Sequence, residues 1–421
     1  MIDNKIIQLE KVLLVGVIHR LSSENIVKEH LDELQLLVKT AGAKVVGRVT
    51  QKISRINPAT LIGIGKAKEI ISQAKEIDAT VIIFDEELSP AQIKNYHKIS
   101  TKIKILDRNG LILDIFKKHA RTKEAKTQVD LAYFEYLLPR LTRQWTHLER
   151  QMGGIGTRAG MGETQIEIDR RLIRTRISRL KKELNKIENE RATQSLHRKS
   201  EYRVSLVGYT NAGKSTLFNS LTGSNVYIKD QLFATLDTTI RKLKLDTSHQ
   251  VLLSDTVGFI RKLPHNLVAS FKSTLKEVLE ADLIIIVLDI SSTEIEEHLE
   301  TINNVLQQMG ANEVPLLHVL NKVDKISDNR KIDKVKRLFI NPVVISAEHH
   351  LMISDLRKRI IEKMESNFQT IEITIPYGDG KVIANAQTGV KVLERFFQDD
   401  AVKLKIRGAR PRIEQIIKSI N

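Results

Sequence analysis

The stretch "RVSLVGYTNAGKST", residues 203–216, decides the fold of the central part of the chain. An apolar run leads into a glycine-bounded loop that ends in Gly-Lys-Ser, and a helical pattern follows. This order of strand, loop and helix is typical of a phosphate-binding loop, in which backbone amides and the helix N-terminus surround phosphate. The residues predicted to contact the nucleotide are Gly208, Tyr209, Thr210, Asn211, Ala212, Gly213, Lys214, Ser215 and Thr216.

The chemistry of such a loop assigns roles to two of its side chains. Lys214 is predicted to reach the β- and γ-phosphates, and the Ser215 hydroxyl to ligate Mg²⁺. A second motif, "VLLSDTVGF" (residues 251–259), is an apolar strand that ends in Asp255. This carboxylate is predicted to hold Mg²⁺ through water, with the Gly258 amide facing the γ-phosphate.

Two later motifs indicate which base is bound. "VPLLHVLNKVD" (residues 314–324) reads as a strand that ends in Asn321, Lys322 and Asp324. The Asp324 carboxylate can accept both the N1 hydrogen and the 2-amino group of guanine, which adenine does not offer. Because unpaired buried polar groups are costly, GTP should be strongly preferred over ATP. "VVISAE" (residues 343–348), with Ser346 and Ala347, resembles the loop that closes over guanine.

The segment "DQLFATLDTTIRKL" (residues 230–243) lies between the first two motifs. Thr235 is the predicted switch threonine, which gives a hydroxyl oxygen to Mg²⁺ and an amide to the γ-phosphate; Thr238 or Thr239 is the second choice. Lys214, Thr235 and Gly258 form the predicted catalytic set.

Phe259 stands where many GTPases carry a glutamine that orients the attacking water. Phenylalanine cannot hydrogen-bond water, so we expect slow unaided turnover and completion of the site by a partner, a rearranged switch or a monovalent cation. Asn211 resembles an asparagine that ligates K⁺ in some GTPases, and a turn-stabilising role is the other interpretation.

The composition adds a polyanionic partner. The 421 residues carry a net charge of +16, which favours nucleic acid or an anionic membrane surface. The absence of cysteine excludes disulfides, thiol catalysis and cysteine-ligated metals. The longest apolar runs, such as Leu283–Leu288, are too short to span a bilayer. We expect a cytoplasmic monomer, with a membrane surface as a second place of association.

The first 110 residues alternate short apolar runs with helical patterns. "VLLVGVI", "KVVGRV", "TLIGIG", "TVIIF" and "KIKIL" read as strands, which predicts a parallel sheet flanked by helices. Asp85 and Asp107 follow strand ends, where open α/β sheets often bind ligands. The other interpretation is that both are helix caps or turn residues. "GIGK" (residues 63–66) likewise reads as a weak phosphate signal or a strand-to-helix turn.

The residues after 125 predict an antiparallel helical hairpin. Two series of apolar residues recur at spacings of three and four, which is typical of a coiled-coil seam. Pro139 should kink or restart the first helix. Residues 139–203 contain 16 Lys and Arg against 8 Asp and Glu, and five glycines fall within 153–162. A basic arm with a flexible tip favours binding of folded RNA over a merely solvated helix face. The two seams consist of Phe134, Leu138, Leu141, Trp145 and Leu148, and of Ile173, Ile177, Leu180, Leu184 and Ile187.

Several longer stretches carry a resemblance to the HflX family of ribosome-associated GTPases over nearly the whole chain. They are "FDEELSPAQ", "ILDIFKKHARTKEAKTQVDLAYFEYLLPRL", "GETQIEIDRR", "DQLFATLD" and "DTVGFIRKLPHNLVASFKSTLKE". The resemblance implies an N-terminal α/β domain (1–124), a helical hairpin (125–200, tip 152–163), a P-loop GTPase domain (201–368) and a small C-terminal α+β domain (369–421). The last of these reads as strand, helix, strand, helix, with "GKVIANAQTGVKVLERFF" as its first helix.

The resemblance also implies what this protein binds and does. Members of the family bind the large (50S) ribosomal subunit, approach its 23S rRNA with the hairpin tip, and split 70S ribosomes under stress. In this chain Arg158, Arg170, Arg171 and Arg174 are the predicted RNA contacts. The tip "RAGMGE" departs from the family's Arg-Gly-Pro-Gly-Glu by an extra residue and a missing proline, which predicts a longer and looser tip. Family members also often bind ATP on the N-terminal domain, which would place a second nucleotide near Gly65, Lys66, Asp85 and Asp107. Two alternatives stand beside splitting: a role in 50S assembly, and a slow nucleotide-gated protein-binding switch.

Overall fold

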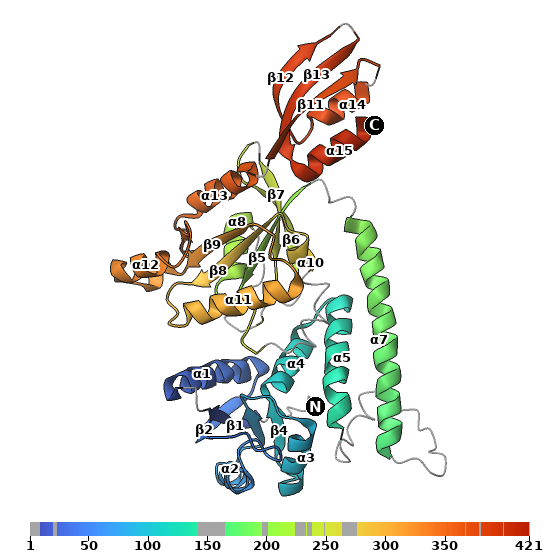
Figure 1. The fold of residues 1–421 in the computed structure, drawn as a ribbon. Coiled ribbons are helices and arrows are strands. Elements are labelled where there is room, and N and C mark those ends of the chain that lie inside the picture. The colour runs from blue at the N-terminus through green and yellow to red at the C-terminus, as the bar shows by residue number, and fades with distance from the viewer. Residues whose placement is uncertain are drawn as a thin grey trace, which may run out of the picture. The chain divides into compact units, whose positions relative to one another are not determined.

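The structure is a computed structural model, and Figure 1 shows its fold. It describes residues 9–19, 23–141, 165–195, 201–223, 233, 238–247, 249–262, 276–366, 368–378, 380–398 and 400–420. The chain divides into two compact units. The first comprises Met1–Lys186, Gln231–Leu236 and Lys262–Phe271, and the second comprises Ile187–Asp230, Asp237–Arg261 and Lys272–Asn421. Each unit is described by itself.

The first unit contains a four-stranded sheet in the order β2-β1-β3-β4, in which every pairing is parallel. Side chains that alternate along β1 explain why helices cover both faces: Leu13 and Val15 pack with Ile70 of α2, while Gly16 lies against Val27 of α1. The predicted parallel sheet is confirmed. The strands are β1 (Lys11–Ile18), β2 (Lys44–Lys52), β3 (Val81–Phe84) and β4 (Lys104–Asp107). The helices are α1 (Glu24–Ala41), α2 (Ile64–Glu76), α3 (Pro90–Ile99), α4 (Arg108–His119) and α5 (Lys123–Leu137).

One predicted strand of this unit is wrong. "TLIGIG" (residues 60–65) forms a turn followed by the start of α2. Leu61 has a φ of 68° and Gly63 a φ of 93°, and an extended strand admits neither angle. Asn57 and Leu61 exchange two backbone hydrogen bonds of 2.8 Å, which closes the turn. Leu61 and Ile62 are buried in this turn, so their apolar character serves burial rather than a strand.

The predicted helical pair is present in its described part. α5 ends at Leu137, and Pro139 lies in the short 3₁₀ helix η1 (Leu138–Arg140), as expected of proline in a helical pattern. α7 spans Gln165–Ser195 and runs beside α5 (Figure 1). One apolar cluster joins the two helices, and Lys181 pairs with Glu135 at 2.9 Å. Trp145, Leu148 and the glycine-rich tip 152–163 lie outside the described residues. The cluster contains Leu131, Phe134, Leu137, Leu141, Ile173, Leu180 and Leu184, with Tyr133, Leu138 and Ile177 packed against it.

The second unit contains a six-stranded sheet in the order β10-β9-β8-β5-β7-β6. Only the β6·β7 pairing is antiparallel, so the carboxyl ends of β5, β7, β8 and β9 meet at one edge. The strands are β5 (Tyr202–Gly208), β6 (Thr239–Lys244), β7 (Gln250–Asp255), β8 (Leu283–Asp289), β9 (Leu316–Asn321) and β10 (Val343–Val344). The helices are α8 (Lys214–Thr222), α10 (Lys276–Leu279), α11 (Ile295–Met309), α12 (Asn329–Lys336) and α13 (Ile353–Ser366), with the 3₁₀ helix η3 (Val323–Lys325).

The end of the chain forms a small antiparallel sheet in the order β11-β13-β12, with two helices. The single helix predicted over residues 380–397 is wrong in its second half: α14 ends at Gln387, and residues 391–397 form β12. Gly389, with a φ of 73°, separates the two. In the described part of the chain, no helix is both long enough and apolar enough to cross a bilayer. The elements are β11 (Phe368–Pro376), α14 (Gly380–Gln387), β12 (Lys391–Phe397), β13 (Ala401–Ala409) and α15 (Arg410–Ile420).

Candidate nucleotide site

The loop between β5 and α8 is shaped by two glycines. A Cβ at Gly208 would lie 2.3 Å from the carbonyl oxygen of Val287 on β8, so no larger residue fits there. Gly213 has a φ of 92°, and a Cβ on it would lie 2.2 Å from the Asn321 side-chain nitrogen. Among the described residues no side chain caps α8, which begins at Lys214. Its first amides are therefore available to an anion.

Lys214 lies inside this loop with only 6% of its surface exposed. Its Nζ donates to the carbonyl oxygens of Gly208, at 3.1 Å, and of Tyr209, at 2.9 Å. Burial lowers the pKa of Lys214 to about 8, and nearby Asp255 partly opposes that shift. The two loop carbonyls thus hold the ammonium in place, and it loses its proton at a lower pH than an exposed lysine does.

Ser215 and Asp255 meet at the carboxyl edge of the sheet. The Ser215 hydroxyl donates to the Asp255 carboxylate at 2.7 Å, and Asp255 is 0% exposed. A hydroxyl oxygen and a carboxylate oxygen are the hard donors that Mg²⁺ prefers. This donor pair therefore fits the ion that the sequence predicts at these two residues.

The predicted base-binding residues form one network. The Asn321 side chain donates to the Ala212 carbonyl and accepts from the Ala347 amide, both at 2.9 Å. It thereby ties the phosphate loop to the segment after β10. Lys322 donates to the Asn211 carbonyl at 2.6 Å and pairs with Asp289 at 2.8 Å.

Asp324 lies at the open side of that network, in η3. A hydrogen bond from the Ser346 side chain is the largest cause that lowers the pKa of Asp324. The carboxylate is thus ionised at neutral pH, as acceptance of two hydrogens from one base requires. Ser346 itself is buried, so its position is fixed by the fold.

Phe259 does not lie free beside the phosphate loop. It is 2% exposed; its amide donates to the Gly208 carbonyl at 3.0 Å, and its carbonyl accepts from the Thr210 amide at 2.7 Å. Gly258 is packed closely, because a Cβ on it would lie 2.9 Å from Lys214 Nζ. The backbone after β7 is therefore paired with the phosphate loop.

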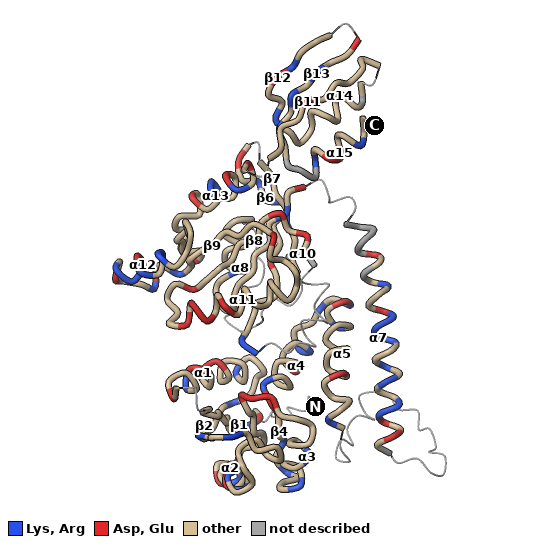
Figure 2. Tube along the Cα trace, in the orientation of Figure 1, with Lys and Arg blue, Asp and Glu red and all other residues tan. Residues whose placement is uncertain are grey.

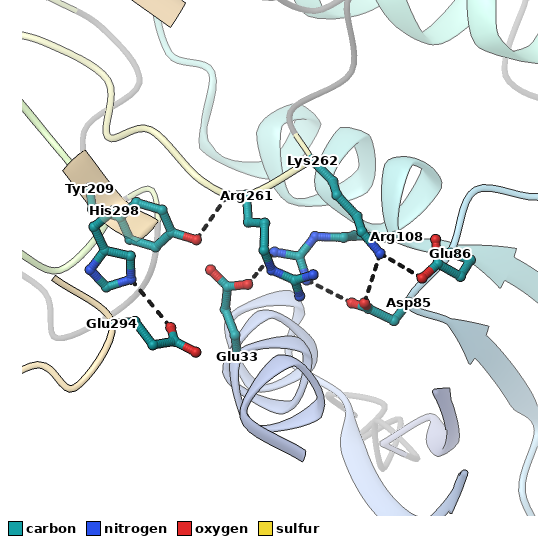
Figure 3. A network of polar contacts seen from close by, with 9 residues as sticks. All are labelled: Glu33, Asp85, Glu86, Arg108, Tyr209, Arg261, Lys262, Glu294 and His298. Carbon is teal, nitrogen blue, oxygen red and sulfur yellow. Dashed lines mark hydrogen bonds and ion pairs between the residues drawn. The ribbon is translucent and has the colours of Figure 1, made fainter. Parts of the chain in front are cut away.

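Tyr209 extends this pairing. Its hydroxyl accepts the Arg261 amide at 2.8 Å, and its ring stacks on His298 of α11 with 3.8 Å between ring centres (Figure 3). His298 could not be found from the sequence, because no spacing rule joins an α11 residue to the loop. The second-choice switch residues lie at the start of β6, where Thr239 is opposite Asp255. Thr235 lies outside the described residues. Asn211 has a φ of 61°, which asparagine tolerates in turns.

The N-terminal candidates are engaged within the first unit. Asp85 pairs with Arg108 at 2.9 Å and with Lys262 at 3.2 Å, and Arg108 also pairs with Glu33 at 2.5 Å (Figure 3). Asp107 caps α4 through the Gly110 amide at 2.8 Å. It also accepts from the Leu88 amide and the Tyr136 hydroxyl, whereas Lys66 pairs with Glu69. These contacts give Asp107 the cap role and Asp85 an ion-pair role.

The outer face of α7 is basic. Figure 2 shows Lys and Arg along most of this helix. Ile173 and Leu180 point into the seam, while the predicted RNA contacts Arg170, Arg171 and Arg174 are exposed. Arg158 lies outside the described residues. The helix thus separates an apolar face, which packs on α5, from a cationic face.

Comparisons with known proteins agree over the length of the chain. Three family models match: "GTP-binding GTPase N-terminal" at residues 28–117, "GTP-binding GTPase Middle Region" at 119–198, and "50S ribosome-binding GTPase" at 203–322. The GTPase HflX of Flavobacterium psychrophilum is 51% identical over 324 residues, which cover 77% of this chain and 78% of that protein. The GTPase HflX of Escherichia coli is 42% identical over 383 residues, which cover 90% of this chain and 89% of that protein.

A solved structure is also similar. The GTP-binding protein of Sulfolobus solfataricus, in complex with GDP, is 27% identical. The match covers 84% of this chain and 98% of that one, with a TM-score of 0.43.

Proposed function

Because the chain belongs to the HflX family of GTPases and binds and hydrolyses GTP, we propose that it uses this cycle on the large ribosomal subunit, where it separates 70S ribosomes into subunits. The observation that carries this proposal is the exposed cationic face of α7, in a chain of net charge +16. Such a face suits RNA phosphates, which supply most of the affinity in RNA binding. We further propose a cytoplasmic monomer that acts during recovery from stress.

The nucleotide site supports a division of roles. Lys214 contacts the β- and γ-phosphates, and the Gly258 amide contacts the γ-phosphate. Ser215 and Asp255, the latter through water, would hold Mg²⁺ together with Thr235, and the ion would supply positive charge to the phosphates. Asp324 accepts from guanine, with Ser346 holding it in place. Asn321 and Lys322 secure the walls of the base pocket.

The burial of Phe259 supports slow unaided hydrolysis. An orienting group at this position would have to face the γ-phosphate, but the ring is buried and its backbone is paired with the loop. Contact with the ribosome would then have to complete the site. Hydrolysis after docking releases the factor, and the arm holds the complex until that step.

The test is GTP turnover of the isolated protein with and without 50S subunits, with 70S dissociation followed by light scattering in the same samples. Lys214→Ala is the inactive control. A triple variant, Arg170→Glu, Arg171→Glu and Arg174→Glu, tests the arm. Its matched control reverses three exposed charges on α12: Arg330→Glu, Lys331→Glu and Lys334→Glu. Parallel samples with K⁺ or Na⁺ test whether a monovalent cation at Asn211 affects turnover. Samples with ATP in place of GTP test whether the N-terminal domain uses ATP.

We expect 50S subunits to accelerate turnover and 70S particles to dissociate. The arm variant should lose both effects and the α12 variant should keep them, because phosphate contacts act locally. Stimulation without loss of 70S would favour the assembly role. Absence of both effects with wild-type protein would refute the proposal.

A further inference from the structure

One side chain of the phosphate loop has an unexplained polar group. Thr210 is 7% exposed, and its hydroxyl oxygen is buried without a hydrogen-bond partner among the residues that the structure describes. Buried hydroxyls are nearly always paired, because an unpaired one has lost its hydrogen bonds to water without replacement. Such an atom, in the loop of a nucleotide site, marks a position where a ligand group is expected.

The surroundings of Thr210 indicate which part of the nucleotide would supply that group. A Cβ placed on Gly258 would lie 3.0 Å from both Thr210 Cα and Thr210 Cγ2, and 2.9 Å from Lys214 Nζ. The Cα and methyl group of Thr210 and the ammonium of Lys214 therefore lie next to Gly258. Lys214 and Gly258 are the two residues assigned to the γ-phosphate.

The backbone of Thr210 is also fixed. Its amide donates to the Phe259 carbonyl at 2.7 Å, so the loop cannot carry the side chain away from Gly258 without breaking that bond. A β-branched residue has few χ1 rotamers, and its hydroxyl can both donate and accept. The methyl group of Thr210 is thus held against Gly258, and the hydroxyl is carried by the same Cβ.

We propose that the Thr210 hydroxyl donates a hydrogen bond to a γ-phosphoryl oxygen of GTP and is a catalytic residue for its hydrolysis. A hydrogen-bond donor at the γ-phosphate stabilises charge that grows toward the transition state. GDP has no γ-phosphate, so this contact exists only with GTP. The hydroxyl compensates in part for the phenylalanine at position 259.

The test compares Thr210→Val, which keeps the shape and removes the hydroxyl, with Thr210→Ser, which keeps the hydroxyl. Single-turnover hydrolysis with excess enzyme, without ribosomes, gives the rate. Titrations with GDP and with a non-hydrolysable GTP analogue give the affinities. We expect Thr210→Val to lower the hydrolysis rate on the order of 10- to 100-fold and to leave GDP affinity unchanged. Thr210→Ser should stay within about threefold of wild type.

Thermal unfolding of the nucleotide-free proteins separates this role from a structural one. Removal of an unpaired hydroxyl should leave the melting temperature of Thr210→Val equal to or above that of wild type. Equal hydrolysis rates for Thr210→Val and wild type would overturn the proposal. So would a parallel loss of GDP and GTP-analogue affinity, or a lower melting temperature for Thr210→Val than for Thr210→Ser. Each outcome is independent of ribosome binding, because no ribosomes are present.

Discussion

The carboxyl edges of the two parallel sheets look alike in sequence and differ in chemistry. In the second unit, β5 leads into α8, and β7 ends in Asp255. In the first unit, β3 ends just before Asp85 and β4 ends in Asp107, after which α4 begins. Both are parallel strands with acidic residues at the carboxyl edge, where open α/β sheets bind ligands.

The two edges differ in which protein groups already bond to their carboxylates and helix amides. Asp107 caps its own helix by accepting the Gly110 amide, whereas α8 starts from Gly213 with no side-chain cap among the described residues. Asp85 faces a guanidinium at 2.9 Å, whereas Asp255 faces a hydroxyl at 2.7 Å. A ligand can replace the hydroxyl contact more easily than a buried ion pair. A strand end therefore becomes a nucleotide site only where loop geometry leaves amides and donors available.

The largest effect is expected from removal of Arg108, which tests whether an ion pair fills the carboxyl edge of the first sheet. Its side chain is 1% exposed and neutralises Asp85 and Glu33, so Arg108→Met would remove the guanidinium from two carboxylates. We expect the free energy of unfolding of the first unit to fall by about 3–5 kcal/mol. Hydrogen exchange of peptides from β1 and β3, measured by mass spectrometry, reports that unit directly.

Arg48→Met is the matched control for this loss. Arg48 pairs with Asp32 at 2.6 Å, but both side chains are substantially exposed, and such pairs contribute about 0–1 kcal/mol. Similar exchange rates in the two variants would show that the Arg108 cluster is not the structural centre that its burial indicates. The first unit would then have room for a ligand at Asp85.

A second experiment tests base recognition by Asp324 in the second unit. Asp324→Asn replaces one acceptor by a donor that faces the N1 hydrogen and 2-amino group of guanine. We expect GTP affinity to fall by about 100-fold and affinity for xanthosine triphosphate, which has a carbonyl in place of the 2-amino group, to rise. Competition against a fluorescent guanine nucleotide measures both values.

Asp328→Asn is the control for that change. Asp328 is an exposed cap of α12 four residues away, and asparagine caps a helix about as well as aspartate. It should leave both affinities unchanged. Unaltered base preference in Asp324→Asn would move the specificity to another residue.

The sequence predicted the second unit more completely than the first, for a physical reason. The phosphate loop, Asp255, Asn321 and Asp324 lie at the strand ends where the motifs predict them, because a short motif encodes each local geometry. By contrast, the partner of Asp85 is 23 residues away, and the Tyr136 hydroxyl that binds Asp107 is 29 residues away. No local pattern joins them, so a cap or turn role was one interpretation beside ligand binding, and the ion pair of Asp85 was not predicted.

The failed secondary-structure predictions have the same origin. "TLIGIG" has a strand's composition, but a turn closed by Asn57 and Leu61 overrides it. In the C-terminal segment, apolar spacing suggested one long helix, whereas Gly389 and pairing with β13 make residues 391–397 a strand. Composition and spacing therefore do not fix the element, which the turn at residues 57–61 and the pairing with β13 decide.

The smallest expected effect concerns Lys214 of the phosphate loop, whose pKa is lowered by burial. Its pKa in the nucleotide-free site is lowered to about 8, chiefly by burial, and bound phosphates favour the charged form and raise it again. Below pH 8 both states carry the proton, so affinity is independent of pH there. Above pH 8 binding must take up a proton, and GDP affinity should fall by up to about tenfold per pH unit. Calorimetric titration in two buffers of different ionisation enthalpy would show proton uptake near pH 8.5 and none near pH 7. Equal heats in both buffers at both values would show that the lysine keeps its proton throughout, and that its burial between the Gly208 and Tyr209 carbonyls is offset by the charge of Asp255.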